Sequence, residues 1–202
     1  MKPLNIVLTG VGGQGILLAS DILCQVGMAV GYDVKKTDVH GMAQRGGSVV
    51  SHVRLADKVF SPLVSTGAAD FLLAFEKLEA CRWARFLHRA GVAVVSDEAI
   101  PTLALAGPSG GAPYPDDTAI AHILCAHASQ VNIVPAGSLA TELGNPRVAN
   151  VILLGTLSRF LDIPVESWHH TIEERVPPRF QELNLRAFDL GREPMAQEYH
   201  PC

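Results

Sequence analysis

The segment DVHGMAQRGG gathers side chains that could bind or transform an anionic ligand. The imidazole of His40 could orient a carboxylate or assist a proton transfer. Arg45 can form a two-pronged pair with a carboxylate or phosphate, and Gln44 can both donate and accept hydrogen bonds. Gly46 and Gly47 let backbone amides come close to a ligand or to another chain. The segment predicts a site on a loop, with His40, Gln44 and Arg45 as the catalytic candidates.

A second candidate is the glycine-rich turn GVGGQG, which follows an apolar strand and opens a helix. Its glycines fit the pattern G-x-G-x-x-G, and the first amides of such a helix attract a phosphate or carboxylate. The alternative is that the glycines only allow the strand and helix to pack closely, and the motif alone does not decide. The candidate cofactor-binding residues are Gly10, Gly12, Gly13, Gln14, Gly15, Gly46, Gly47 and Asn150.

Asn150 is included because it is a polar residue in the apolar helix NPRVANVILLG. A buried asparagine needs hydrogen-bond partners, which could be the glycine turn, a ligand there, or simply neighbouring helices. A nicotinamide-type site is less well supported. It needs an acidic residue at the end of the second strand, and the nearest candidate, Asp38, lies late and follows Lys35 and Lys36.

Segments with the pattern of strands alternate with segments with the pattern of helices along the chain. We therefore predict an α/β fold with a mostly parallel sheet covered by helices on both faces. The alternating run 49–55 is expected to form an inserted antiparallel hairpin with residues 59–64 across the turn at 56–58. We expect one domain over residues 1–191 and a loose tail over 192–202. Strands are expected at 4–10, 33–39, 49–55, 70–75, 91–97 and 131–137. Helices are expected at 16–29 with a stop at Gly31, and at 76–90, 118–130, 138–144, 145–161, 164–176 and 178–191.

The composition is apolar for a chain of this size, with 48% hydrophobic and 18% charged residues and a mean hydropathy of +0.23. Such a balance suits a sheet buried on both faces, a surface covered by a partner subunit, or both. The net charge of −4 without a basic run argues against a nucleic-acid binder. No apolar run approaches the roughly 20 residues that cross a bilayer, so no membrane role is expected.

The cysteines indicate no metal centre and no disulfide framework. No two of them form a C-x-x-C pair, so we expect no metal site in this chain. Cys24 and Cys125 are interpreted as small core residues. Without disulfides, and without a charged-then-apolar leader at the start, the chain is expected to be cytoplasmic.

Four motifs in order, GVGGQG, DVHGMAQRGGSVVSHVRL, NPRVANVILLG and LNLRAFDLG, resemble the gamma-type module of the 2-oxoacid:ferredoxin oxidoreductases. The resemblance covers residues 4–191, and the joint order of the motifs is specific, whereas each motif alone is not. The form HGMAQRGG resembles the members that act on indolepyruvate. The resemblance implies a Rossmann-like domain that packs against a thiamine-binding region and helps to enclose the active site and coenzyme A.

The same resemblance implies the chemistry of the whole enzyme. Such an enzyme decarboxylates an aryl pyruvate on thiamine diphosphate and Mg²⁺, passes electrons through iron–sulfur clusters to ferredoxin, and releases an acyl-coenzyme A. The thiamine diphosphate and the clusters belong to the partner alpha subunit. This chain would bind no cofactor alone, would meet coenzyme A as a co-substrate, and would be inactive by itself.

Alternatives remain open for the loop and for the protein. Residues His40 to Gly47 could touch a ligand or the alpha subunit, or they could form a bulged loop in which Arg45 pairs with an acid. The chain could also be a stand-alone Rossmann-like nucleotide-binding protein. A third possibility is a structural partner subunit whose glycine turn binds nothing.

Overall fold

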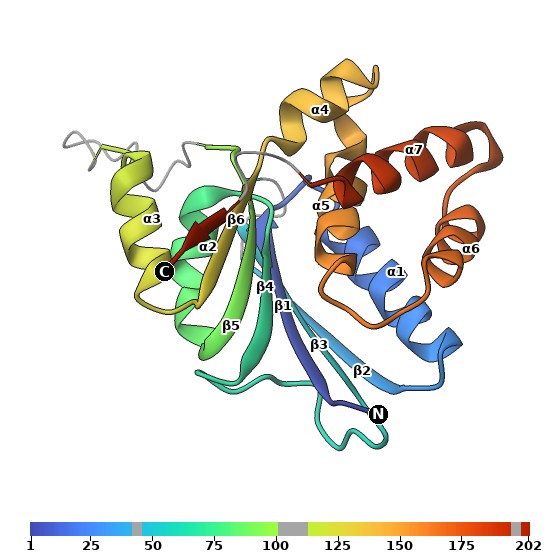
Figure 1. The fold of residues 1–202 in the computed structure, drawn as a ribbon, viewed down its shortest axis with the longest axis horizontal. Helices are drawn as coiled ribbons and strands as arrows, with labels where there is room; N and C mark the ends of the chain where they lie inside the picture. The colour runs from blue at the N-terminus through green and yellow to red at the C-terminus, as the bar shows by residue number, and fades with distance from the viewer. Residues whose placement is uncertain (42–45, 101–112, 195–198) are drawn as a thin grey trace.

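The computed structural model describes residues 1–41, 46–100, 113–194 and 199–202. Its centre is a seven-stranded sheet with the order β2-β3-β1-β4-β5-β6-β7 (Figure 1). The four strands β1, β4, β5 and β6 run parallel, while β2, β3 and β7 are antiparallel to their neighbours. The strands are β1 (Leu4–Val11), β2 (Asp33–His40), β3 (Ser48–Ala56), β4 (Ala69–Ala74), β5 (Leu87–Ser96), β6 (Gln130–Val134) and β7 (Tyr199–Pro201).

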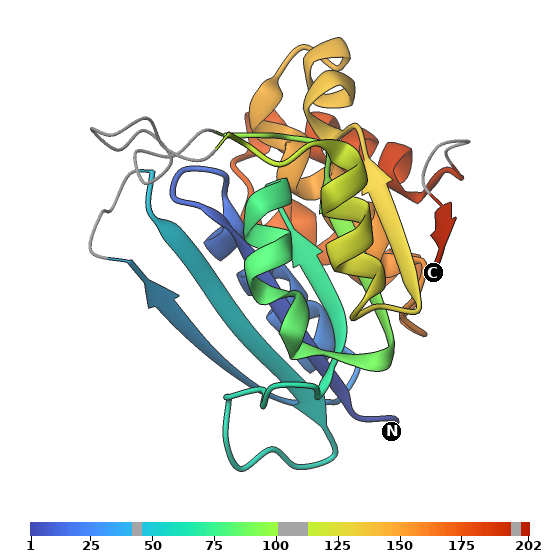
Figure 2. The same ribbon diagram turned by 90° about the vertical axis from the view of Figure 1, so that its left-hand side faces the viewer.

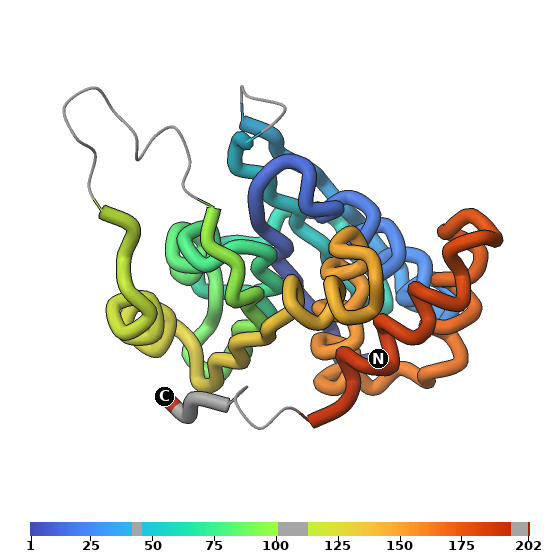
Figure 3. Tube along the Cα trace, turned by 90° about the horizontal axis from the view of Figure 1, so that it is seen from above, coloured from blue at the N-terminus to red at the C-terminus, as the bar shows by residue number. Residues whose placement is uncertain are grey.

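Helices cover both faces of the sheet. Figure 3 shows α2 and α3 on one side of the strands and α1, α5, α6 and α7 on the other. Side chains alternate along β1, so Ile6 and Leu8 enter the core under α1 and α5, and Val7 enters the core under α2. The helices are α1 (Ile16–Ala29), α2 (Lys77–Trp83), α3 (Asp117–Cys125), α4 (Ala136–Glu142), α5 (Ala149–Ser158), α6 (Val165–Arg175) and α7 (Gln181–Arg192).

The predicted fold class is confirmed, including an antiparallel hairpin in a mostly parallel sheet. The predicted partner of the hairpin was wrong, because β3 pairs with β2 rather than with residues 59–64. The latter segment forms no strand. Pro62 cannot donate a ladder hydrogen bond, and the amide of Val59 bonds instead to the Asp33 carboxylate at 2.8 Å. Figure 2 shows β2 and β3 extending beyond α2 and α3, the helices that cover the face of the sheet turned toward the viewer.

The helix predicted over 76–90 is shorter than expected. Helix α2 ends at Trp83, a 3₁₀ turn follows over Ala84–Phe86, and β5 begins at Leu87. Leu87 pairs with Ala69 of β4 across a register shift and is buried there. An apolar residue satisfies a helical face and a buried strand equally well, so periodicity did not separate the two.

The end of the chain is not a loose tail throughout. Strand β7 pairs antiparallel with β6, and Cys202 forms a disulfide with Cys125 at the end of α3. The expectation of no disulfide was therefore wrong. Cys125 is partly buried and packs against the core, as expected. The two cysteines are 77 positions apart, and no local pattern joins them. Cys24 does lie in the core, where burial raises the pKa of its thiol to about 12.

Replacing Cys202 by serine should lower the melting temperature of the oxidised protein by roughly 5–10 °C. A link across 77 positions restricts the unfolded chain, and its loss costs about 2–4 kcal/mol. Calorimetry with and without dithiothreitol measures this effect. The parent protein and the variant should have the same melting temperature once the thiols are reduced. Equal melting temperatures under oxidising conditions would contradict the pairing.

Within the described ranges, no helix is both long and apolar enough to cross a membrane.

Candidate functional site

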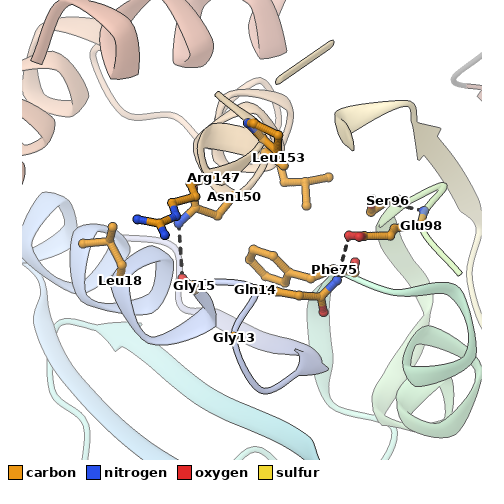
Figure 4. Close-up of a pocket in the computed structure, with 12 residues that line it drawn as sticks. Gly13, Gln14, Gly15, Leu18, Phe75, Ser96, Glu98, Arg147, Asn150 and Leu153 are labelled. Atoms are coloured by element: carbon orange, nitrogen blue, oxygen red, sulfur yellow. Dashed lines mark hydrogen bonds between the residues drawn. The ribbon is translucent and has the colours of Figure 1, made fainter. Parts of the chain in front are cut away.

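A pocket of about 390 Å³ opens at the carboxyl ends of β1, β4 and β5, beside the start of α5 (Figure 4). Helix α1 leaves β1 on one face of the sheet, and α2 leaves β4 on the other (Figure 1). Such a reversal between neighbouring strands is where open α/β sheets commonly bind ligands. The pocket is lined by Gly13, Gln14, Gly15, Leu18, Phe75, Ser96, Glu98, Pro146, Arg147, Ala149, Asn150 and Leu153.

The glycine turn forms the floor of this pocket. Gly13 and Gly15 have φ angles of 112° and 80°, which glycine adopts without a steric penalty. Gly15 is the N-cap of α1, and no side chain caps the helix. The first amides of α1 are therefore left for solvent or a ligand at the positive end of the helix dipole.

Asn150 joins the turn to α5. Its Nδ2 donates to the carbonyl of Gly15 at 3.4 Å, and the residue is only 4% exposed. A Cβ atom on Gly15 would lie 2.5 Å from that nitrogen, so any larger residue here would displace the side-chain amide of Asn150. Asn150 thus reaches the glycine turn, which was one of the arrangements expected from the sequence.

Gln14 uses its side chain to hold the strand ends together. Its Oε1 accepts from the amide of Val11 at 2.7 Å. Its Nε2 donates to the carbonyl of Phe75 at 2.7 Å and to the carboxylate of Glu98 at 2.9 Å. These bonds tie β1, β4 and the residues after β5 into one wall. The amide of Gln14 is occupied internally, so its contribution to the pocket is to shape it.

The pocket carries opposite charges on its two sides. Arg147 lies at the α5 side, exposed, and Glu98 lies across from it beside Gln14 (Figure 4). Asn145 accepts from the amide of Arg147 at 3.1 Å and so caps the short helical turn that carries Arg147. Leu18, Phe75 and Leu153 supply apolar wall between the charges. This arrangement suits a ligand with an anionic group at one end and hydrogen-bond donors at the other.

Sequence reasoning missed Arg147 and Glu98. Arg147 precedes Asn150 by three positions, which places both on one side of a helical segment. Glu98 lies just beyond the end of β5, where ligands of such sheets commonly bind. Both signals were present in the sequence but did not distinguish these residues from ordinary surface charges.

The described parts of the first candidate segment lie beside the turn but do not line the pocket. His40 is the exposed last residue of β2, and Gly46 and Gly47 directly precede β3. The amide of Gly12 donates to the carbonyl of Gly47 at 2.9 Å, which joins the two glycine segments. Gln44 and Arg45 lie outside the described residues.

The part of the chain that the structure describes has no group of three or more His, Cys, Asp or Glu residues that could hold a metal ion. His52 has a structural role. Its Nδ1 accepts from the amide of Val64 at 3.4 Å, its ring packs against Trp83 and Phe86, and burial lowers its pKa. The neutral ring is therefore favoured in the fold.

Two relatives have similar length and sequence. The indolepyruvate oxidoreductase subunit IorB of Pyrococcus horikoshii is 39% identical over 95% of each chain. The subunit of the same name from Thermococcus kodakarensis is 38% identical over 95% of each chain.

Two solved structures share the fold. The pyruvate oxidoreductase subunit PORC from Thermotoga maritima matches with a TM-score of 0.72 and 19% identity, over 99% of this chain and 98% of that one. The 2-oxoglutarate:ferredoxin oxidoreductase from Magnetococcus marinus matches with a TM-score of 0.70 and 21% identity, over 95% of this chain and 31% of that one. The family described as pyruvate ferredoxin/flavodoxin oxidoreductase matches residues 5–194. The chain therefore belongs to the pyruvate ferredoxin/flavodoxin oxidoreductase family.

Proposed function

We propose that this chain is the cofactor-free subunit of a 2-oxoacid:ferredoxin oxidoreductase that acts on indolepyruvate or a related aryl pyruvate. The observation that carries the proposal is the 39% identity over 95% of both chains to an indolepyruvate oxidoreductase subunit. In this proposal the alpha subunit holds thiamine diphosphate, Mg²⁺ and the iron–sulfur clusters, and ferredoxin accepts the electrons. The cytoplasmic location expected from the sequence stays a prediction, and the Cys125–Cys202 disulfide removes part of its argument.

The pocket at the glycine turn would bind part of coenzyme A. The helix dipole of α1 and the guanidinium of Arg147 suit a phosphate group, and the apolar wall suits the uncharged parts of the coenzyme. Asn150 and Gln14 would hold the turn in the required shape. The Magnetococcus enzyme, whose domain has a similar fold, was solved with coenzyme A bound. A pocket of about 390 Å³ accommodates a fraction of the coenzyme, so the rest would lie along the partner subunit.

A structural partner subunit is the second candidate. The internal hydrogen bonds of Gln14 favour it, since they show that part of the motif maintains the fold rather than contacting a ligand. A stand-alone nucleotide-binding protein is a third, and it requires tight binding of an adenine nucleotide to the isolated chain. If the chain is a structural subunit, substitutions in the glycine turn and the His40–Gly47 loop should disturb assembly but leave coenzyme A kinetics unchanged. If it is a stand-alone protein, it should need no partner.

Reconstitution tests the proposal. The purified alpha subunit is assayed with thiamine diphosphate, coenzyme A, indolepyruvate and an electron acceptor, with and without this chain. We expect acceptor reduction only in the mixture. Two proteins that neither associate nor react would overturn the proposal, and a nucleotide screen on the isolated chain would then address the third candidate.

We also expect Arg45→Ala to lower turnover, or to raise the KM for coenzyme A or the oxoacid, by roughly tenfold to 150-fold. Loss of a two-pronged charged contact to a ligand costs on the order of 1.5–3 kcal/mol. Steady-state kinetics of the reconstituted complex measure the effect, and circular dichroism checks that the fold is intact. Unchanged kinetics would remove Arg45 from the catalytic candidates and leave the loop as an interface.

A further inference from the structure

Two carboxylates are buried outside the pocket, at the start of α2. Glu76 and Glu79 are each 1% exposed. Burial of a carboxylate is costly unless hydrogen bonds or an opposite charge compensate it. Their partners therefore indicate what the two residues hold in place.

Glu79 holds the start of β3. Its Oε2 accepts from the hydroxyl of Ser48 at 2.5 Å, and its Oε1 pairs with Arg82. Its own amide donates to Oε2 of Glu76 at 2.8 Å, so the two residues form one unit at the N-terminus of α2. The carboxylate of Glu76 is also favoured there by the helix dipole.

Glu76 binds the part of the chain that follows β5. Its Oε1 accepts from the amide of Ile100 at 3.1 Å and from the hydroxyl of Tyr114 at 2.5 Å. The Tyr114 hydroxyl in turn accepts from the amide of Leu78 at 3.1 Å. Burial and the neighbouring Glu76 raise the pKa of Tyr114, which keeps the phenol protonated as a donor.

Both sets of bonds lead to the walls of the pocket. Ser48 follows Gly47, whose carbonyl accepts from the amide of Gly12 in the glycine turn. Ile100 lies two residues after Glu98, which lines the pocket, and the carbonyl of Glu98 accepts from the amide of Lys77 at 3.0 Å. One carboxylate is thus connected to the glycine turn and the other to the opposite wall.

We propose that Glu76 and Glu79 are positioning residues that set the distance between the glycine turn and the Glu98 wall for coenzyme A. The inference builds on the function proposed above for the pocket. Neither residue lines the pocket. Glu79 acts through Ser48 and Gly47, and Glu76 acts through Ile100. The competing explanation is that the pair only caps α2 and stabilises the fold.

Ser48 allows a mild test, because its removal leaves both carboxylates and Arg82 in place. Ser48→Ala should raise the KM for coenzyme A about fivefold to tenfold, which lies within the range expected for the loss of one typical hydrogen bond. The kcat and the KM for the oxoacid should change by less than about twofold. Ser48→Thr keeps the hydroxyl at the edge of β3 and should restore the KM.

Ser51→Ala is the matched control. Ser51 lies on the same strand, and its hydroxyl donates to the carboxylate of Asp38 at 2.6 Å, on the opposite face of the sheet. Both alanine variants remove one serine–carboxylate bond, and their melting temperatures report the structural cost. We expect Ser51→Ala to leave the KM for coenzyme A unchanged. An equal rise in KM for both variants, or no rise for Ser48→Ala, would overturn the positioning role.

Different kinetic results would contradict the positioning role and the proposed binding of coenzyme A. If Gly15→Ala raises the KM for coenzyme A but Ser48→Ala does not, the pocket binds the coenzyme and only the positioning role is wrong. If neither substitution affects coenzyme A kinetics in an active complex, the pocket itself does not bind coenzyme A. All measurements use the reconstituted complex.

Discussion

Replacing Gly191 by alanine should lower the free energy of unfolding by about 3 kcal/mol or more, the largest effect on stability that we expect. A Cβ atom at Gly191 of α7 would lie closer than 3.0 Å to the carbonyl of Ile152 in α5. A Cβ at Gly155 would collide in the same way with the carbonyl of Phe188. Both obstacles are backbone atoms, so the two helices would have to move apart.

That movement would disturb the core as well as the contact. The hydroxyl of Thr156 donates to the carbonyl of Gly191 at 2.9 Å in the buried interface of α5 and α7. Phe188 stacks on Trp168 of α6, with ring centroids 5.5 Å apart. Separation of α7 from α5 would break the hydrogen bond from Thr156 to Gly191 and loosen the aromatic packing.

Urea unfolding of the purified protein measures the change. Gly137→Ala is the control, since Gly137 lies in α4 and a Cβ there would meet nothing within 4 Å. That variant should be neutral, or more stable by a few tenths of a kcal/mol through helix propensity. If Gly191→Ala has the same unfolding midpoint as the parent protein, α7 can shift without cost and the crossing is not tightly packed.

These glycines illustrate what the sequence predicts and what it leaves open. Both helices were predicted from their periodicity, and each glycine ends a motif that the resemblance had identified. Nothing in either motif indicates that Gly155 and Gly191 face each other, because contact between distant segments is a property of the packed fold. The same reason explains the undetected pairing of Cys125 with Cys202.

The sheet was predictable where hydrophobicity has a clear period. The apolar strands β1, β4, β5 and β6 were all expected, and so was the more polar β2. The hairpin partner of β3 was not, because choosing between β2 and residues 59–64 depends on which segment can complete a backbone ladder. Two features prevent residues 59–64 from forming this ladder. Pro62 has no amide hydrogen to donate, and the amide of Val59 donates to the carboxylate of Asp33.

The site was predicted only in outline. The glycine turn follows from local sequence, and the contact from Asn150 was one of three open options. The internal bonds of Gln14 could not be predicted, since its partners Phe75 and Glu98 lie 61 and 84 positions away. Binding by the turn, by His40 and by the other candidate residues stays a prediction.

Replacing Gly15 by alanine should raise the KM for coenzyme A at least tenfold in the reconstituted complex, corresponding to about 1.4 kcal/mol of lost binding energy. The new methyl group would lie 2.5 Å from Nδ2 of Asn150, and this amide must then leave the carbonyl of Gly15. The floor of the pocket and the first turn of α1 would shift together. The φ angle of 80° adds a strain of about 1–2 kcal/mol for any residue with a Cβ.

The strain and the collision can be separated by Gly67→Ala. Gly67 has a φ of 74°, almost the same as Gly15, but a Cβ there would meet nothing within 4 Å, and it lies on the loop before β4, away from the pocket. Both variants should lose similar stability from backbone strain, and only Gly15→Ala should lose coenzyme A binding as well. If both variants left the KM unchanged while melting at lower temperatures, the turn would serve the fold alone. That result would favour the structural partner subunit, because the glycines would then be needed only for packing of β1, α1 and Asn150.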